Sequence, residues 1–346
     1  MKLEISLDDA LAKARPGLRY RMEQSVALIR KAEKLAKMYD AENGFYLAFS
    51  GGKDSQVLYH IAELSGVAFK GHFSPTSIDP PQVIRFIRRN YPEIEFEKIH
   101  QSIYDMAIEK RIFPTQRFRW CCAEFKEVGG AGKVVLTGVR HAESAKRAKR
   151  QEVEVSGRKF SGTIEDFQNW RVEQLEKKNK GVNHDEFTRD KEQEVACISG
   201  KDKVIVNPLV DWSDSDVWDF LNKVIEVPHC ELYDPPFNQH RVGCIMCPMQ
   251  NPKQKRREAQ MYPYVYNNWV KVAEKFIRGG VLPRVEKTVT QLWAERRSIF
   301  GNGGGISLPP MMKKRLPNLL VDWWISGLSW DEFVDKQTNP NLFEEE

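Results

Sequence analysis

The stretch FYLAFSGGKDSQVLYHIAELSG, residues 45–66, decides the fold. It opens with a short apolar run typical of a buried strand, and apolar positions recur at helical spacing from Ser55 to Leu64. A glycine-rich turn between a strand and a helix directs backbone N–H groups and the positive end of the helix at one point, which suits an anion such as phosphate. The turn consists of Ser50, Gly51, Gly52, Lys53, Asp54 and Ser55.

This turn differs from the loop of P-loop NTPases. That signature needs a glycine six positions before its lysine and a Ser or Thr after the lysine, whereas here Leu47 and Asp54 occupy those positions. Lys53 supplies a mobile positive charge, and the hydroxyls of Ser50 and Ser55 are potential donors. For Asp54 we expect either a contact to Mg²⁺ or a hydrogen bond that shapes the loop.

Strand and helix patterns alternate on both sides of the turn. Apolar runs at 67–74, 94–100, 134–140 and 204–209 predict further strands, and residues 80–92 and 211–224 have helical patterns. This alternation predicts an α/β fold with a twisted, mostly parallel sheet and helices on both faces. Ser213 is the expected N-cap of the last helix, with Asp216 in the capping-box position.

The chain divides by pattern into three parts. Residues 1–40 predict a helical lead-in with a break at Pro16-Gly17, 41–250 the α/β domain, and 251–346 a helical C-terminal region. Within the α/β domain, residues from about 146 to 203 are dense in charge and poor in strand signals. They predict an insertion that is helical in part.

Composition limits the class of protein and its location. A net charge of +5, from 53 basic and 48 acidic side chains, is compatible with an anionic ligand and does not by itself indicate nucleic acid. No apolar stretch is long enough to span a membrane, and the N-terminus lacks the apolar core of a signal peptide. We therefore expect a cytoplasmic protein, whose six cysteines are metal ligands or catalytic thiols rather than disulfides.

Four cysteines form a candidate metal site. Cys121 and Cys122 are adjacent, and Cys244 and Cys247 form a C-x₂-C motif. Four thiolates from two short segments can bind zinc or a [4Fe–4S] cluster. Neighbouring cysteines point in different directions on an extended strand, which suits the separated irons of a cluster better than a single zinc ion. Cys230 is an alternative ligand if the adjacent pair supplies only one.

Several further segments occur in a fixed order after the loop. They are RWCCAEFKE (119–127), VLTGVRHAESAKRA (135–148), NPLVDWSDSDVWDFL (207–221) and PHCELYDPPFNQHRVGCIMC (228–247). Together with SGGKDS they resemble the phosphoadenosine phosphosulfate (PAPS) reductase family of the PP-loop ATP pyrophosphatase superfamily. The resemblance covers roughly residues 40–250 and implies an adenine nucleotide α-hydrolase-like fold, with the nucleotide at the carboxyl ends of the strands.

The resemblance also implies roles for individual residues. The cysteines at 121, 122, 244 and 247 match those that hold a [4Fe–4S] cluster in adenylylsulfate reductases, and zinc remains the alternative. Lys126 matches a lysine between cluster and substrate, and Asp79 lies where the family contacts adenosine or ribose. Arg140 follows a strand, where a guanidinium can clamp phosphate or sulfate. Lys53 and Arg140 are therefore the predicted catalytic residues.

The reductases of this family attack sulfur with a cysteine in a Glu-Cys-Gly-Leu-His motif near the C-terminus, and this sequence has no cysteine after Cys247. It therefore favours ATP-dependent adenylation with sulfur transfer, with ATP or an adenylylsulfate-type nucleotide, and Mg²⁺, as ligands. The alternatives are a sulfonucleotide reductase that uses Cys197, Cys230 or a partner's thiol, and a nucleotide-sensing regulator. The basic run NPKQKRRE (251–258) and the C-terminal helices are candidates for docking a protein or nucleic-acid acceptor. The sequence leaves the acceptor and the oligomeric state open.

Overall fold

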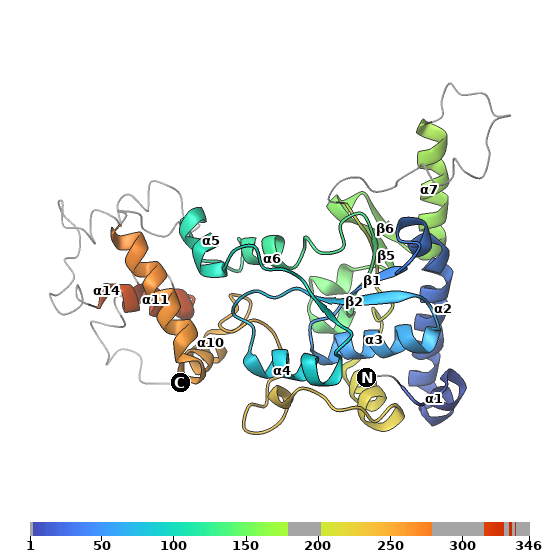
Figure 1. Ribbon diagram of the computed structural model, residues 1–346, viewed down its shortest axis with the longest axis horizontal. Helices are drawn as coiled ribbons and strands as arrows, with labels where there is room; N and C mark the ends of the chain where they lie inside the picture. Colours follow the sequence, from blue (N-terminus) through green and yellow to red (C-terminus); the bar gives the residue numbers. More distant parts are fainter. Residues whose placement is uncertain (1–2, 179–201, 279–314, 329–331, 334–335, 337–346) are drawn as a thin grey trace. The chain divides into compact units, whose positions relative to one another are not determined.

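The computed structural model describes residues 3–178, 202–278, 315–328, 332–333 and 336 (Figure 1). The chain forms two compact units, each assembled from separate segments of sequence. We call residues 1–74, 81–98 and 128–242 the sheet unit, and residues 75–80, 99–127 and 243–346 the helical unit. Each unit has its own buried hydrophobic core.

The sheet unit is built on one seven-stranded sheet (Figure 1). Five neighbouring strands are parallel, and the two strands at one edge are antiparallel to their neighbours. In spatial order the strands are β3 (Glu95–Phe96), β2 (Phe69–Phe73), β1 (Phe45–Ala48), β4 (Val134–Leu136), β7 (Val204–Val206), β5 (Val153–Val155) and β6 (Phe160–Gly162).

Helices surround this sheet and begin and end where the sequence provides caps. The main ones are α1 (Leu7–Lys13), α2 (Pro16–Tyr39), α3 (Lys53–Ser65), α4 (Pro81–Asn90), α7 (Ile164–Lys178) and α9 (Asp214–Asp219), which continues as the π-helical turn η5 (Phe220–Val224). Gly66 ends α3 in a left-handed conformation. The predicted capping box of Ser213 and Asp216 at the start of α9 is confirmed. The predicted α/β fold with a mostly parallel sheet is confirmed as well.

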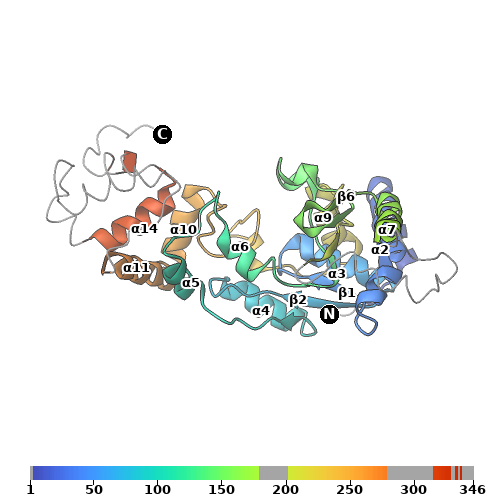
Figure 2. The same ribbon diagram turned by 90° about the horizontal axis from the view of Figure 1, so that it is seen from above.

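The helical unit consists of α5 (Ile103–Lys110), α6 (Trp120–Phe125), α10 (Pro252–Met261), α11 (Pro263–Arg278) and α14 (Leu316–Ser326) (Figure 2). Aromatic side chains fill its core: the ring of Trp269 contacts Phe113, Trp324 and Tyr104 at centroid distances of 5.0–5.6 Å. Such edge-to-face and tilted pairs add to the energy of burial. The tryptophan-rich C-terminal sequence therefore provides a packed core for the cysteine-bearing segments.

The division of the chain differs from the predicted one. The N-terminal helices belong to the sheet unit, and the segments 75–80, 99–127 and 243–250 belong to the helical unit. The charged insertion contains two strands, β5 and β6, that the sequence pattern did not reveal. Part of the insertion (179–201, with Cys197) and residues 279–314 lie outside the described residues. Among the described helices, none has the length and apolar character that a membrane crossing requires.

Candidate functional site

The SGGKDS loop lies where the order of the parallel strands reverses. From β1, the chain continues to β2 on one side, whereas β4 pairs with β1 on the other side. Ligands of open α/β sheets bind at the carboxyl ends of the strands beside such a switch point. The loops that follow β1 and β4 approach closely here: a Cβ atom on Gly138 would lie 2.9 Å from the carbonyl oxygen of Asp54. Glycine at 138 therefore permits the approach.

The glycines of the loop are required by its geometry. Gly51 has a φ of +73°, and a Cβ atom there would lie 2.9 Å from the side chain of Val83 on α4. Gly52 is the N-cap of α3, so the first backbone N–H groups of that helix face the loop. The hydroxyl of Ser55 donates to the carbonyl of Gly52 at 2.8 Å and lies 3.2 Å from the hydroxyl of Ser50. The structure thus brings these four predicted residues together at a helix N-terminus suited to an anion.

Lys53 is buried, with 6% of its surface exposed. Its ammonium donates to the backbone carbonyl of His240 at 3.3 Å. The Nζ atom of Lys53 lies 3.5 Å from a carboxylate oxygen of Asp214 and 3.8 Å from a carboxylate oxygen of Asp54. The predicted phosphate-binding lysine is therefore held at the loop by one carbonyl and two carboxylates.

Arg140 is also buried, with 1% exposure. Its Nε donates to Asp54 and its Nη2 to Asp214, both at 2.7 Å, and its Nη1 donates to the carbonyl of Trp212 at 3.0 Å. All three nitrogens are used within the protein. Asp54 thus makes the loop-shaping bond expected as one of its two roles. The phosphate clamp predicted for Arg140, and the contact of Asp54 to Mg²⁺, stay predictions.

The charges in this group influence one another. Burial raises the pKa of Asp54, although Lys53 and Arg140 oppose that shift. Burial also disfavours ionisation of Asp214, but the hydrogen bond and charge of Arg140, together with Lys53, outweigh it and lower the pKa of Asp214. The site therefore places two cations and two carboxylates in a partly desolvated position beside the helix N-terminus.

Two residues at this loop were not predicted from the sequence. Asp214 follows the predicted N-cap Ser213 and is bonded to Arg140, 74 residues away in sequence. The hydroxyl of Tyr233 accepts a hydrogen bond from the backbone N–H of Lys53 at 2.9 Å across 180 residues. The predicted capping box located the chain segment of Asp214, but no local pattern in the sequence identified Tyr233.

The four predicted metal ligands gather in the helical unit. Cys121 and Cys122 lie on α6, and Cys244 and Cys247 lie on a turn before α10. The Cys121 thiol hydrogen-bonds Cys122, which lowers the pKa of Cys122 to about 6, and Cys121 interacts electrostatically with both Cys244 and Cys247. Burial raises the pKa of Cys247 to about 11. Cys230 belongs to the sheet unit, is fully buried, and is not part of this group.

Two predicted nucleotide-binding residues lie with these cysteines in the helical unit. Lys126, at the C-terminal end of α6, hydrogen-bonds Cys244, and its interactions with the Cys244 sulfur and the Asp79 carboxylate raise the pKa of the lysine. Asp79 also lies 3.9 Å from the Cys244 sulfur and accepts a bond from the backbone N–H of Thr76. The hydroxyl of Thr76 donates to the same sulfur at 3.3 Å. Cys244 thus has three polar neighbours: Lys126, Thr76 and Asp79.

The side chains present are of the types that bind a metal ion or an iron–sulfur cluster through sulfur. Among the described residues, no three or more His, Cys, Asp or Glu side chains are arranged as a ready-made metal-ion site. Two buried polar atoms nearby in sequence, however, find no hydrogen-bond partner in that part of the chain: the indole N–H of Trp120 and the side-chain oxygen of Gln250. Hydrogen bonds to sulfur are a regular feature of iron–sulfur sites. Four thiols and an unpaired N–H donor are chemically suited to such a group.

Helix α10 stabilises the C-x₂-C turn through hydrogen bonds. The buried carboxylate of Glu258 accepts a bond from the backbone N–H of Met246 at 2.6 Å, and Met246 has a positive φ of 55°. Gln250 and Gln254 donate to the other oxygen of this carboxylate at 2.8 and 2.9 Å. Burial lowers the pKa of the neighbouring Lys255 to about 8. Part of the basic run predicted for docking therefore faces the interior of the unit.

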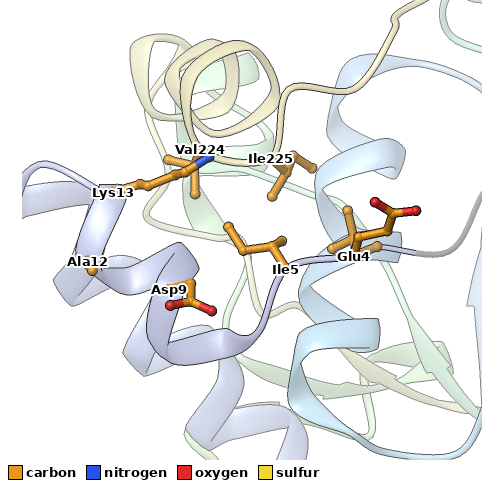
Figure 3. A pocket seen from close by; sticks show the side chains of 8 residues that line it. Glu4, Ile5, Asp9, Ala12, Lys13, Val224 and Ile225 are labelled. Carbon is orange, nitrogen blue, oxygen red and sulfur yellow. The ribbon is translucent and has the colours of Figure 1, made fainter.

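A separate open pocket of about 520 Å³ lies in the sheet unit at the N-terminal segment (Figure 3). Its lining combines apolar side chains, such as that of Leu3, with the charged side chains of Glu4, Asp9 and Lys13. The backbone N–H of Leu3 bonds Glu63 near the C-terminal end of α3, whereas the SGGKDS loop is at the N-terminal end of that helix. This pocket is therefore distinct from the phosphate-type site.

Comparisons with known proteins place the chain among its relatives at different levels. The chain is 25% identical over 278 residues to an uncharacterized protein of Methanocaldococcus jannaschii, an alignment that covers 78% of this chain and 57% of that protein. The chain thus spans little more than half the length of that relative. Crystal structures of the Candida glabrata FMN adenylyltransferase, one of them a complex with FMN and the ATP analogue AMPCPP, align over 71% of this chain and 72–74% of theirs. Their identities of 14–15% and TM-scores of 0.37–0.38 are too low to support a conclusion.

The match to a family model shows which family the chain belongs to. The model of the phosphoadenosine phosphosulfate reductase domain matches residues 44–250, more than half of the chain. The matched range includes the SGGKDS loop, Arg140 and all four clustered cysteines, and it supports an adenine nucleotide as the ligand of the loop. The chain therefore belongs to the phosphoadenosine phosphosulfate reductase domain family, as a PP-loop protein with an adenine nucleotide α-hydrolase-like fold.

Proposed function

We propose that this protein binds ATP at the SGGKDS loop and uses it to adenylate an acceptor oxygen, which a sulfur nucleophile then replaces. The observation that carries the proposal is the loop itself. Backbone N–H groups at the start of α3, two close-packed glycines and the buried ammonium of Lys53 converge at the switch point of a parallel sheet. An anion with several oxygens suits this arrangement better than a neutral ligand.

The chemistry follows from where negative charge develops. The acceptor oxygen attacks the α-phosphorus of ATP, the bond from that phosphorus to the bridging oxygen breaks, and pyrophosphate leaves with the electron pair. The loop N–H groups and Lys53 stabilise the growing charge on pyrophosphate. In the second step sulfur attacks the activated carbon and AMP leaves, so that the acceptor exchanges an oxygen for a sulfur.

The state of Cys230 favours this proposal over sulfonucleotide reduction by the Cys230 thiol. A reductase needs a thiolate that reaches the substrate's sulfur. Cys230 is fully buried, and burial raises its pKa to about 11, so it is neither accessible nor ionised at neutral pH. The alternative of a non-enzymatic nucleotide sensor shares the binding site and differs only in turnover.

The cysteines of the helical unit are the proposed ligands of a metal or cluster, in addition to the nucleotide at the loop. Cys121, Cys122, Cys244 and Cys247 would hold a [4Fe–4S] cluster, with zinc as the alternative, and a fully ligated cluster supplies electrostatic or structural stabilisation. Two of the three polar groups beside Cys244 favour a charged sulfur ligand, whereas the carboxylate of Asp79, 3.9 Å away, does not. Lys126 hydrogen-bonds Cys244, and the hydroxyl of Thr76 donates to its sulfur.

A ligand screen and a turnover assay test the proposal together. Thermal shift with ATP, adenylylsulfate and phosphoadenylylsulfate identifies the nucleotide, and release of pyrophosphate from ATP reports adenylation. Lys53→Ala is expected to lower the rate about a hundredfold, because it removes one preorganised charge from the leaving group. Lys70→Ala is the matched control, since Lys70 is an exposed lysine of the same unit paired with Glu95.

The outcomes separate the candidate functions. Nucleotide binding with pyrophosphate release that Lys53→Ala abolishes supports adenylation. Release of sulfite from adenylylsulfate or its 3′-phosphate, with a thiol reductant, would instead assign the protein to the reductases. Binding of ATP without turnover across a panel of protein and nucleic-acid acceptors would favour the sensor.

A further inference from the structure

The phenol of Tyr233 lies at the start of α3, beside the loop. Its oxygen accepts the backbone N–H of Lys53 at 2.9 Å, and the backbone of Val242 also interacts with it. A Cβ atom on Gly52 would lie 3.2 Å from the same oxygen. The tyrosine hydroxyl is therefore part of the surface that surrounds the loop, although it comes from a distant segment of the chain.

The ring is held in place on several sides. Its centroid lies 5.1 Å from that of Trp218 in an edge-to-face contact and 6.2 Å from that of His229. The ammonium of Lys53 lies 5.9 Å from the ring centroid, within range of a cation–π contact. These contacts fix the direction of the hydroxyl, so its position beside the loop is built into the fold.

The hydrogen-bond capacity of the phenol leaves one group unused. A tyrosine oxygen accepts up to two hydrogen bonds and donates one. The backbone N–H of Lys53 fills one acceptor position, and the backbone of Val242 interacts with the same oxygen. Among the described residues, the hydroxyl hydrogen has no acceptor. Burial raises the pKa of Tyr233, so that hydrogen is present at neutral pH.

We propose that Tyr233 donates its hydroxyl hydrogen to a phosphate oxygen of the nucleotide bound at the SGGKDS loop. This assignment rests on the proposed function, because it needs a nucleotide phosphate in the loop. A phosphate oxygen is the acceptor that complements an unpaired O–H beside converging N–H donors. Tyr233 then links the segment that ends at Val242 to the occupied loop and contributes to selection of a phosphorylated ligand.

Calorimetric titration with α,β-methylene-ATP, which has no cleavable bond between its α- and β-phosphates, tests the assignment. Tyr233→Phe keeps the ring and its contacts and removes only the hydroxyl. The loss of a hydrogen bond to a charged phosphate predicts a rise in the dissociation constant of about tenfold to a hundredfold. Tyr59→Phe is the control: Tyr59 lies on α3 itself, and its hydroxyl donates to Glu93 rather than facing the loop, so we expect no change in affinity.

Failure of this inference is distinguishable from failure of the proposed function. If wild type binds the analogue and Tyr233→Phe binds it as well or more tightly, the hydroxyl makes no bond to phosphate and the assignment is overturned while the function stands. If wild type itself binds no nucleotide, the proposed function fails and the assignment fails with it. Thermal melting of both variants verifies that each is folded.

Discussion

At the scale of the residue, the side chain of Arg140 fixes the relative positions of the loop, the end of β4 and the start of α9. Its planar fork reaches two carboxylates and one carbonyl from separate segments of the sheet unit. A guanidinium can satisfy three acceptors in fixed directions, whereas the ammonium of lysine is a compact charge on a flexible stem. The loop, the strand end of β4 and the start of α9 are thereby joined at a single buried cation.

We predict that Arg140→Lys destabilises the protein by about 2–4 kcal/mol, because a shorter ammonium leaves buried acceptors without a partner. Unfolding in urea, followed by circular dichroism, measures the change. Arg19→Lys is the matched control, since Arg19 is an exposed arginine paired only with Glu23 one helical turn away, and it should change stability by less than about 0.5 kcal/mol. Equal effects of the two substitutions would contradict the structural role of Arg140.

At this scale the sequence identified the residue types of the site but not the hydrogen-bond partners of each side chain. Strand-end reasoning correctly brought Arg140 to the same sheet edge as the SGGKDS loop. Its bond to Asp214 joins residues 74 positions apart, and the bond between Lys53 and Tyr233 spans 180. Neither follows from periodicity or spacing, which report only local structure. A clamp on phosphate was the natural prediction for Arg140, because the sequence contains no sign of the internal carboxylates that its guanidinium bonds.

At the scale of the element, α3 carries a buried polar network behind the loop. The ring of His60 is fully buried, with one nitrogen 3.0 Å from Glu63 and the other 2.9 Å from the hydroxyl of Tyr91. Gln56 donates to the same hydroxyl at 3.0 Å. This network connects α3 to the residue that follows α4, and thus helps to hold the helix whose N-terminus forms the anion site.

The stability of this network should depend on pH. Burial lowers the pKa of His60, an effect that Glu63 opposes without cancelling. The unfolded chain therefore binds the proton more readily, so the contribution of His60 is present above its unfolded pKa of about 6.5 and is lost as pH falls below it. The loss is at most about 1.4 kcal/mol per pH unit.

Unfolding free energies measured from pH 7.5 to 5 should fall more steeply for wild type than for His60→Gln, which cannot titrate. The difference between the two slopes isolates His60 from the other histidines. Parallel slopes would mean that His60 is protonated equally in the folded and unfolded states, contrary to its burial.

In the helical unit, helix α10 holds the C-x₂-C turn in place, as the polar network on α3 holds the helix beside the loop in the sheet unit. Glu258 accepts the backbone N–H of Met246 inside the C-x₂-C turn and is 2% exposed. We predict that Glu258→Ala lowers the metal content of purified protein severalfold and destabilises the unit by about 2–3 kcal/mol, because it leaves a buried N–H unpaired between Cys244 and Cys247, two of the proposed ligands. Iron and zinc per chain, after anaerobic purification, and thermal melting measure the two effects.

Gln260→Ala, at an exposed position of the same helix, is the control for that experiment and should change neither quantity. Glu258→Gln keeps an acceptor oxygen and is expected to recover part of the metal content. Full metal content in Glu258→Ala would show that the turn holds its shape without this carboxylate.

The elements themselves were predictable to different degrees. Strong local signals, such as the capping box of Ser213 and the apolar runs of β1 and β4, gave the correct elements. The strands β5 and β6 were missed because each is three residues long and lies in a charged segment, where alternation over so few positions is not distinctive. Their place in the sheet comes from pairing with β7, which no local pattern encodes.

At the scale of the whole molecule, the chain builds two cores from interleaved segments. The core of the sheet unit includes residues before and after both insertions of helical-unit sequence. The predicted boundaries at 40 and 250 followed changes of composition along the chain. Composition cannot reveal that residues 99–127 and 243–278 share one core, because that depends on contacts between segments more than a hundred residues apart. Truncation after residue 242, for example, would separate residues 75–80 and 99–127 from the rest of the helical unit.

Separate cores with separate candidate ligands predict separate responses to those ligands. The SGGKDS loop lies in the sheet unit and the four cysteines in the helical unit. A ligand stabilises the unit that binds it by mass action, about 2.7 kcal/mol at a hundredfold excess over its dissociation constant. Scanning calorimetry of the full chain should therefore resolve one unfolding transition that rises with α,β-methylene-ATP and another that falls when a chelator removes the metal. The anaerobically purified protein should absorb at about 400 nm if that metal is an iron–sulfur cluster. A colourless protein with one zinc per chain would exclude the cluster. A single transition that responds equally to both ligands would contradict independent units, because each ligand would then stabilise the whole chain as one cooperative structure.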